Sequence, residues 1–543
     1  MQSSIVVLVL ACTAFAVSTR LLLIPLATAN TFFDPDETYQ ATLVAQTHAC
    51  DTAKLNLLPW EWRNHVRSYA HILPFYTYFK YISECSGSIF DELAPRAMQS
   101  TLTATAGDVA VALYAYRHAK RVYERDEARA RAVAQTTFVC HLTCWFIAYC
   151  GQRTYSSAAE ASFTTLGVLL FDGLRARVAG LVCAALACAV RPTAALFWMP
   201  VGIAAMVHEA HDASSPYAAA KLAATAGAVA LCALTLLACV DKAFYGRWTF
   251  PMLEFVRFNV VSGGARLYGT HPWHWYVSQA IPAQLFTYVP FAVVGAWRAL
   301  RSSRSWEAAI SHHAPLLGAL AYVVAMSLQP HKELRFVLPV LPILCVYAAH
   351  ALCRGSSGSR SRGALLVGTL AALQLVPLLF FGTYHQRGPI QASRYLAWHS
   401  KPVHALWLAP CHSAPQFFPT RGMHARFLDC TPSPWFTPTP GSNGTSPTHP
   451  TEWRQALHDG TSKMTEERRF FANSSRFARA CLGDISYTHV ATFERGEEEE
   501  GLLRALRDYD YELVGRWPND AFGLLDDDRR GLWVSVWEKK KCL

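Results

Sequence analysis

The chain has 543 residues, of which 52% are hydrophobic and 16% are charged, and its formal net charge is +10. Soluble globular proteins carry about 25% charged residues, so this composition excludes an ordinary soluble enzyme and indicates a polytopic membrane protein. The positive charge does not indicate a nucleic-acid partner, because the basic residues fall in short clusters between apolar segments. Many of the 16 cysteines lie inside apolar segments, and no cysteine or histidine constellation has zinc-site spacing.

Apolar segments of about 20 residues predict about eleven transmembrane helices in a mainly α-helical protein. The predicted ranges are 5–29, 95–117, 131–150, 155–172, 177–192, 193–207, 217–240, 275–298, 313–328, 334–353 and 363–383. The first range is too long for a signal-peptide apolar region and predicts an uncleaved span. Arg191-Pro192 divides 177–207 into two helices, because proline interrupts a helix.

Basic residues are concentrated in four segments, at 115–131, 172–177, 297–306 and 353–363. With eleven spans and a cytosolic N-terminus, all four segments fall on one side of the membrane. The positive-inside rule assigns that side to the cytosol. The loop 31–95 and everything after about residue 382 then lie on the lumenal side.

The first loop, 31–95, contains two segments, 38–50 and 66–82, that read as helices too short and too polar to span. We expect them to lie along the membrane surface. Tryptophan and tyrosine settle at the level of the lipid headgroups, and this loop supplies Trp60, Trp62, Tyr69, Tyr76 and Tyr78.

Three carboxylates, Asp34, Asp36 and Glu37, follow the first span directly. One interpretation is a solvated loop that caps the next helix. A second is a general base at the membrane surface, with one carboxylate removing a hydroxyl proton while its neighbour positions the acceptor. A third is a metal-binding Asp-x-Asp pair, formed by Asp34 and Asp36, that holds a nucleotide-sugar diphosphate.

Two later lumenal loops carry further polar groups. The segment 244–276 contains His271, Trp273 and His274 between flexible glycines, and it would suit a loop that covers a sugar. The segment 329–343 contains His331, Lys332 and Arg335 at the mouth of a span. Such cations either snorkel to the surface or stabilise a phosphate leaving group.

The part from 384 to 543 has no segment long and apolar enough to span, and it predicts a small lumenal α/β domain with a Pro/Ser/Thr-rich insert at 431–451. It contains two N-glycosylation sequons, at Asn443 and Asn473, which agree with a lumenal location. The terminal Lys540 and Lys541 match a cytosolic dilysine signal instead, and we interpret them as a surface lysine cluster.

The acidic motif at 34–37, "HKELRF" at 331–336 and the many spans resemble the dolichyl-phosphate-mannose-dependent mannosyltransferases of glycosyltransferase family 22. Further motifs resemble the members of that family that act on glycosylphosphatidylinositol (GPI) precursors. These are "WEW" with "RSY" (60–69), "RPTA" (191–194), "FYGRWT" to "YGTHPWHWY" (244–276), "PCHSAP" (410–415) and "RFLDC" (426–430).

The resemblance implies a GT-C fold in the membrane of the endoplasmic reticulum, with residues 1–383 as the catalytic domain and the active site in the lumen. It implies transfer of the third mannose, in α1,2 linkage, from dolichyl phosphate mannose to the GPI precursor. The β-linked donor and α-linked product imply an inverting displacement. No metal or other cofactor is expected, and the sequence leaves the oligomeric state open.

The resemblance also implies roles for particular residues. Asp36 is the expected base and Glu37 its acceptor-orienting partner, whereas Asp34 is not expected to be catalytic. His331, Lys332 and Arg335 are expected to bind the donor phosphate, with Glu333 orienting them. The possible substrate-binding residues are Trp60, Arg67, Tyr69, Arg191, His271, Trp273 and His274. We also expect a possible Cys411–Cys430 disulfide and a possible pairing of Arg153 with Glu160.

Three alternatives remain open from the sequence. The first is another lumenal mannosyltransferase, which adds the fourth GPI mannose or extends the N-glycan precursor. The second is a polytopic transporter, although we find no internal repeat and the polar clusters lie at the ends of the spans rather than at their middles. The third is a non-catalytic scaffold subunit, which would have little use for these carboxylates and cations.

Overall fold

A computed structural model describes most of the chain. The described residues are 2–23, 29–50, 58–83, 85, 88–123, 126–212, 216–303, 305–355, 360–399, 402–415, 423–428, 466–484, 487–494, 500–520 and 530–540. The insert predicted at 431–451 and the sequon at Asn443 lie outside these residues.

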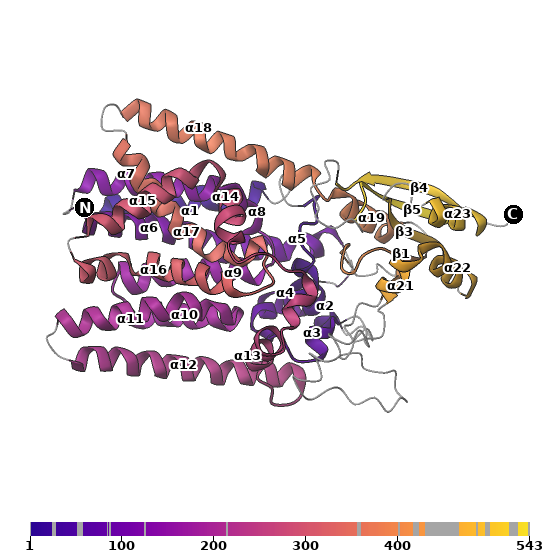
Figure 1. The fold of residues 1–543 in the computed structure, drawn as a ribbon, viewed down its shortest axis with the longest axis horizontal. Coiled ribbons are helices and arrows are strands. Elements are labelled where there is room, and N and C mark those ends of the chain that lie inside the picture. The colour runs from indigo at the N-terminus through magenta and orange to yellow at the C-terminus, as the bar shows by residue number, and fades with distance from the viewer. Residues whose placement is uncertain are drawn as a thin grey trace.

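The protein consists of a long helical body and a smaller C-terminal domain at one end of it (Figure 1). The helices of the body are α1 (Gln2–Leu23), α2 (Leu43–Ala49), α3 (Trp60–Arg63), α4 (Leu73–Tyr81), α5 (Ile89–Met98), α6 (Thr105–Val122), α7 (Glu127–Thr143), α8 (Trp145–Cys150), α9 (Ser156–Val168), α10 (Arg177–Val190), α11 (Ala195–Asp212), α12 (Pro216–Tyr245), α13 (Pro251–Val256), α14 (Ile281–Leu285), α15 (Val289–Ser302), α16 (Trp306–Leu328), α17 (Leu341–Gly355) and α18 (Arg360–Leu379). Short π-helical and 3-10 segments extend several of them, including Thr38–Thr42 before α2 and Leu334–Val340 before α17.

Helices occupy each range predicted to span the membrane. Five helical segments of the described chain are long and apolar enough to cross a bilayer: Pro192–His211, Pro216–Tyr245, Tyr276–Ser302, Leu334–Cys353 and Ser361–Ala397. The total of eleven spans stays a prediction. α12 and α18 expose long apolar faces, including Leu231, Leu236 and Val376, which is the pattern of a surface in contact with lipid.

The predicted break at Arg191-Pro192 is confirmed. α10 ends at Val190, and Arg191 adopts an extended backbone before a 3-10 turn at Pro192–Ala194 leads into α11. Proline lacks the N–H group that would continue the helix, so the chain reverses direction here. The reversal leaves the Arg191 side chain, which is 6% exposed, at the end of the body nearest α2–α4.

A buried ion pair links α1 to α6. Arg20 donates to both carboxylate oxygens of Asp108, at 3.0 and 2.7 Å, and His141 of α7 lies 2.9 Å from the same carboxylate. The charged groups of Arg20 and Asp108 are almost wholly buried, so each requires the other as a partner. This contact explains the arginine that interrupts the apolar N-terminal segment.

The C-terminal domain is an α/β unit, as expected. Its five-stranded sheet has the order β2-β1-β3-β5-β4, with β1 parallel to β2 and β3, and β5 antiparallel to β3 and β4. The elements are α19 (Arg387–Ala397), β1 (Val403–Leu408), β2 (Met423–Phe427), α21 (Glu466–Ala472), α22 (Ser474–Asp484), β3 (His489–Glu494), α23 (Glu500–Asp508), β4 (Tyr511–Pro518) and β5 (Trp533–Lys539).

α19 connects this domain to the helical body. It follows α18 and packs against β4 and β5, and its Arg394 reaches back to the body (Figure 1). The Arg394 guanidinium donates to Glu92 of α5 at 2.7 Å and to the carbonyl oxygen of Ala29 at 2.7 Å. The domain is therefore fixed over the end of the body that contains the first loop.

Candidate functional site

Arg335 joins three carboxylates from two distant loops. Its guanidinium donates to Asp34 at 3.1 Å and to Asp36, and it forms an ion pair with Glu333 at 2.5 Å. The Arg335 side chain is 4% exposed, whereas those of Asp34, Asp36 and Glu333 are 18%, 19% and 26% exposed. The acids therefore open toward solvent around a buried cation.

The local backbone fixes this arrangement. The Asp36 N–H donates to the Asp34 carboxylate at 2.9 Å, a turn in which the first acid supports the second. Arg335 is the second residue of the 3-10 segment Leu334–Val340, which begins directly after Glu333, whose backbone is extended. The two loops thus present their charged groups to each other at one end of the helical body.

The cluster holds more negative than positive charge. Burial, with the charges of Glu333 and Asp36, raises the pKa of Asp34 to about 8 although Arg335 opposes the shift. For Glu333, burial is outweighed by Arg335 and His331, which hold its pKa below the usual value. At neutral pH Asp34 therefore binds a proton, and ionised Glu333 stays beside Arg335.

Glu37 lies apart from this cluster. It is 3% exposed, and its two carboxylate oxygens accept from Arg96 at 2.6 Å and from Arg153 at 2.7 Å. Burial would raise the pKa of Glu37, but the two guanidinium groups outweigh it and lower the pKa. In this structure Glu37 fastens the acidic loop to α5 and to the segment before α9.

The expected pairing of Arg153 with Glu160 is wrong. Arg153 binds Glu37 and the carbonyl oxygen of Thr31, at 2.7 and 3.1 Å. Glu160 instead pairs with Arg191, at 3.2 Å. Their places in a short loop and near the start of the next helix suggested the first pair, but the break before α11 brings Arg191 to Glu160.

His331 and Lys332, which were also expected to bind the donor phosphate, have environments that differ from that of Arg335. His331 lies 2.8 Å from Glu333 and 3.2 Å from the carbonyl oxygen of Gly269. Burial would lower the pKa of His331, but Glu333 raises it above its usual value. The Lys332 ammonium donates to the carbonyl oxygens of His271, at 3.1 Å, and Gln329, so it holds two loops together.

A cavity lies beside the cluster and is lined by two of the predicted substrate-binding arginines, Arg67 and Arg191. Gln40 also lines it and follows Asp36 by four residues, so one helical turn separates the acid from the cavity wall. Arg67 pairs with Glu61 at 3.1 Å. The remaining wall is largely apolar, with Trp62, Met252 and Phe255 among its members.

The aromatic residues of the first loop are more buried than predicted. Trp60, Trp62 and Tyr69 are 4%, 2% and 1% exposed, so they are interior residues and not headgroup anchors. Trp60 donates to the Tyr268 hydroxyl at 3.1 Å, and Tyr69 stacks on Phe244. These contacts secure the first loop to α12 and to the segment that follows it.

In the loop 264–276, the three residues predicted to bind substrate do not form one cluster. The His271 ring stacks on Trp275, with centroids 4.4 Å apart. Trp273 is 72% exposed, and His274 is exposed with its ring 2.9 Å from Ser278. The three side chains therefore have different surroundings: His271 packs on a tryptophan, whereas Trp273 and His274 are exposed.

The C-terminal domain contributes a residue that the sequence did not predict for the site. The Tyr39 hydroxyl donates to the carbonyl oxygen of Ala414 at 2.8 Å, and its ring lies 4.3 Å from that of His412. Burial lowers the pKa of His412 to about 4, although the nearby charge of Asp36 opposes the shift. The "PCHSAP" segment thus covers the acidic loop.

Two cysteine findings concern the same end of the molecule. Cys50 and Cys85 form a disulfide within the first loop, which the sequence did not predict. Cys411 is disulfide-bonded, and Cys430, its expected partner, lies outside the described residues.

Asn473, the asparagine of the second sequon, is exposed, and its side chain caps the first turn of α22 by accepting from the Arg476 N–H at 2.9 Å.

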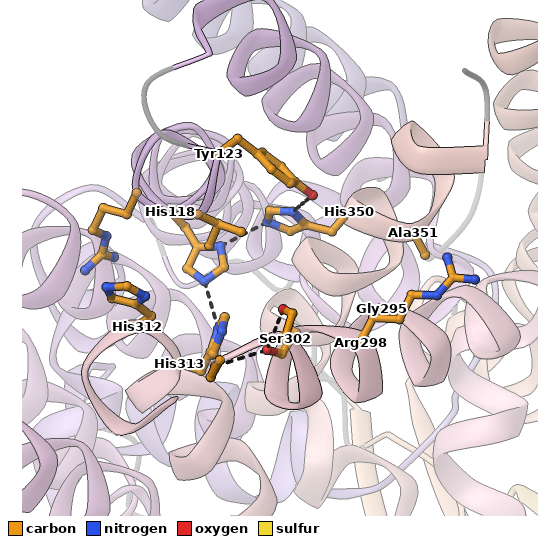
Figure 2. Close-up of a pocket in the computed structure, with 13 residues that line it drawn as sticks. His118, Tyr123, Gly295, Arg298, Ser302, His312, His313, His350 and Ala351 are labelled. Carbon is orange, nitrogen blue, oxygen red and sulfur yellow. Dashed lines mark hydrogen bonds between the residues drawn. The ribbon is translucent and has the colours of Figure 1, made fainter. Parts of the chain in front are cut away.

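A second cavity lies at the opposite end of the body. Figure 2 shows His118 between His350, at 2.9 Å, and His313, at 3.2 Å, with Tyr123 bound to His350. Arg121 and Arg298 also line this cavity, and no carboxylate does. Its histidines satisfy one another, so we regard the acidic cluster, and not this cavity, as the candidate active site.

Residues from three of the four basic segments, 115–131, 172–177 and 297–306, lie at this second end. The cavity in Figure 2 brings together the ends of α6, α15 and α17, and Arg121 donates to Asp172 at 3.2 Å. Arg175 and Arg177 lie beside Ile310 and Ala314. Three of the segments therefore lie at the same end of the fold, and the side of the membrane that they face stays a prediction.

Comparison with known proteins gives one family and one fold. Residues 12–419 match the model of the Alg9-like mannosyltransferase family. Mannosyltransferase APTG1 of Arabidopsis thaliana is 32% identical over 459 residues, which cover 78% of this chain and 77% of that protein. GPI alpha-1,2-mannosyltransferase 3 of Mus musculus is 31% identical over 420 residues, covering 74% and 71%. The crystal structure of ArnT from Cupriavidus metallidurans in the apo state has a TM-score of 0.52 at 11% identity, over 98% of each chain, and is similar in fold alone.

Proposed function

The chain belongs to the Alg9-like mannosyltransferase family, and we propose that it adds the third mannose, in α1,2 linkage, to the GPI precursor in the lumen of the endoplasmic reticulum. The donor in this proposal is dolichyl phosphate mannose, and the reaction needs no metal. The names of relatives such as GPI alpha-1,2-mannosyltransferase 3 of Mus musculus support the substrate.

The observation that carries the mechanism is the Arg335 cluster beside the cavity. Asp36 is a partly exposed carboxylate next to a buried cation, and the cavity wall begins one helical turn away at Gln40. A general base must accept a proton and still reach a substrate hydroxyl. Asp36 fits this requirement better than Glu37, whose carboxylate oxygens are both occupied by arginines.

The transfer is a single displacement. The acceptor mannose hydroxyl attacks C1 of the donor mannose while its proton passes to Asp36, and the bond between C1 and the phosphate oxygen breaks. Dolichyl phosphate leaves with the electron pair, and the attack from the opposite face converts the β linkage into an α linkage. A phosphate leaves readily, so the reaction needs cations around it and no general acid.

Arg67 and Arg191 line the cavity and are the cations best placed for the donor phosphate. Arg335 donates to Asp36 and holds this carboxylate in orientation. His331 and Lys332 support the surrounding loops through Glu333 and two backbone carbonyl oxygens. Protonated Asp34 limits the negative charge that a phosphate would meet.

The test is a transfer assay with the purified protein, dolichyl phosphate mannose and a GPI acceptor carrying two mannoses. Asp36→Asn should lower kcat by roughly 10²–10⁴-fold, because the amide cannot accept the proton. Asp34→Asn is the matched control, since it alters the neighbouring acid and should retain most of the activity. An active Asp36→Asn protein, or an Asp34→Asn protein as inactive as Asp36→Asn, would contradict the assignment.

A further inference from the structure

Three side chains from separate segments of the C-terminal domain converge on one point. His489 of β3 and Glu538 of β5 are direct partners in the antiparallel ladder, so their side chains leave the same face of the sheet. His399 follows the end of α19 and faces them, its ring 5.1 Å from that of His489. One ligand atom from each of the three residues lies within 4.8 Å of the others.

The His489 ring has an unsatisfied nitrogen. The residue is 2% exposed, and its Nε2 atom has no hydrogen-bond partner. A buried polar atom without a partner destabilises the folded state, so such an atom requires a reason. Nε2 lies 4.0 Å from the Glu538 carboxylate, which is too long for a hydrogen bond.

The other nitrogen of His489 is fixed by Thr488. The Thr488 hydroxyl accepts from the His404 N–H at 2.8 Å and donates to the His404 carbonyl oxygen at 3.3 Å. The same hydroxyl lies 2.9 Å from His489 Nδ1. When the hydroxyl accepts from Nδ1–H, Nε2 presents a lone pair, which is the form in which histidine binds a metal ion.

The distance of 4.0 Å between His489 Nε2 and the Glu538 carboxylate means that no direct hydrogen bond between these two groups explains why they converge.

We propose that His399, His489 and Glu538 bind a Zn²⁺ ion that fastens the end of α19 to the sheet. Zinc binds histidine nitrogen and carboxylate oxygen at about 2.0–2.2 Å, which requires donor atoms roughly 3.3 Å apart in a tetrahedral site. A shift of less than about 1 Å closes the His489–Glu538 distance to that value. The Glu538 side chain is 31% exposed, so water can occupy the fourth position.

The position of the site gives it a structural role. α19 also carries Arg394, which binds Glu92 and Ala29 of the helical body. A zinc ion at His399 would fix the far end of this connection on the sheet. The site is separate from the transfer chemistry, whose proposed residues include no zinc ligand, and it does not depend on the proposed function.

The test is zinc content by mass spectrometry of the full-length protein, purified in detergent through a tag without histidine. We expect about one zinc per chain in the wild type, and loss of it in His399→Ala and Glu538→Gln. His424→Ala is the control, because His424 is an exposed histidine on edge strand β2 of the same sheet and should leave the zinc in place. His399 is partly exposed, so His399→Ala should fold even if replacement of buried His489 prevents folding.

A second measurement examines the fastening itself. Removing zinc with a chelator should lower the thermal midpoint of the wild type by several degrees, and added ZnCl₂ should restore it, whereas neither step should affect His399→Ala. Equal zinc content in the wild type and His399→Ala would overturn the proposed site. A wild-type midpoint that does not respond to zinc would overturn the proposed fastening.

Discussion

At the scale of single residues, Arg335 determines what the acidic motif can do. One guanidinium contacts Asp34, Asp36 and Glu333, so the acids are held by a protein cation at the position where an Asp-x-Asp motif would place a metal. The cluster has three carboxylates for one arginine. A proton on Asp34 reduces this imbalance and leaves Asp36 to act as the base.

The raised pKa of Asp34 predicts how stability depends on pH. The folded pKa is about 8 and the ordinary value is 3.8, so the folded protein binds more protons than the unfolded chain between these values. The contribution of Asp34 to stability is therefore fully present below about pH 4 and is lost as the pH rises through about 8. The thermal midpoint of the wild type should fall relative to that of Asp34→Asn across this range.

The measurement is the thermal midpoint of both proteins in detergent at several pH values between 5 and 9. Asp36→Asn serves as a control for the loss of a carboxylate at the same place. If the difference between the wild type and Asp34→Asn stays constant over this range, Asp34 is not protonated in the folded protein.

The sequence identified several members of this site but not their contacts. Asp34, Asp36 and Arg335 were recognisable because charged residues at the ends of apolar segments are conspicuous. Their contact joins positions 301 and 299 residues apart, which no local pattern reveals. Arg96 and His412 were missed, and Arg153 was paired with the wrong partner, for the same reason, since each acts through a partner supplied by the fold.

At the scale of elements, local signals predicted helices well and their surroundings poorly. The proline at 192 correctly separated α10 from α11. The aromatic residues of the first loop were expected at the membrane surface, because composition cannot distinguish a headgroup anchor from a core residue. Packing decides which of the two a residue becomes, and Trp62 and Tyr69 belong to a buried cluster with residues of α2 and α4.

The Cys50–Cys85 disulfide should stabilise this first-loop unit. It closes a loop with a sequence separation of 35, and disulfides of this kind contribute about 2–4 kcal/mol. The double variant Cys50→Ala/Cys85→Ala should therefore unfold at a lower temperature than the wild type. Cys232→Ala/Cys239→Ala is the control, because those cysteines are free and exposed. Recovery of Cys50 and Cys85 as free thiols from the oxidised protein would refute this prediction.

The buried Arg20–Asp108 pair should contribute more to the free energy of unfolding than the exposed ion pairs do. Removing one partner leaves an uncompensated buried charge, which costs about 3–5 kcal/mol. Asp108→Leu should thus lower the thermal midpoint strongly, and Arg20→Met in the same chain should restore much of it. Arg479→Met breaks the exposed pair with Asp508 and should have little effect. Equal effects of the buried and exposed variants would show that burial does not govern this pair.

At the scale of the whole molecule, the two ends of the helical body have different chemistry. One end holds the histidine cavity of Figure 2, which is lined by Arg121 and Arg298, and the other holds the acidic cluster under the C-terminal domain. The distribution of basic residues predicted that the two ends differ. This difference depends on which loops follow odd- and even-numbered spans, and not on side-chain contacts. The placement of the domain over the site depended on contacts such as Tyr39 with Ala414, which the sequence could not supply.

The central claim is that this protein adds the third mannose of the GPI precursor, with Asp36 as the base. The most direct measurement is to identify the GPI intermediate that accumulates in cells lacking the protein, and to repeat it with the wild type or Asp36→Asn restored. We predict accumulation of the two-mannose species, cleared by the wild type and not by a membrane-inserted Asp36→Asn protein. Accumulation of a three-mannose species would contradict the account. So would clearance of the two-mannose species by Asp36→Asn as efficiently as by the wild type.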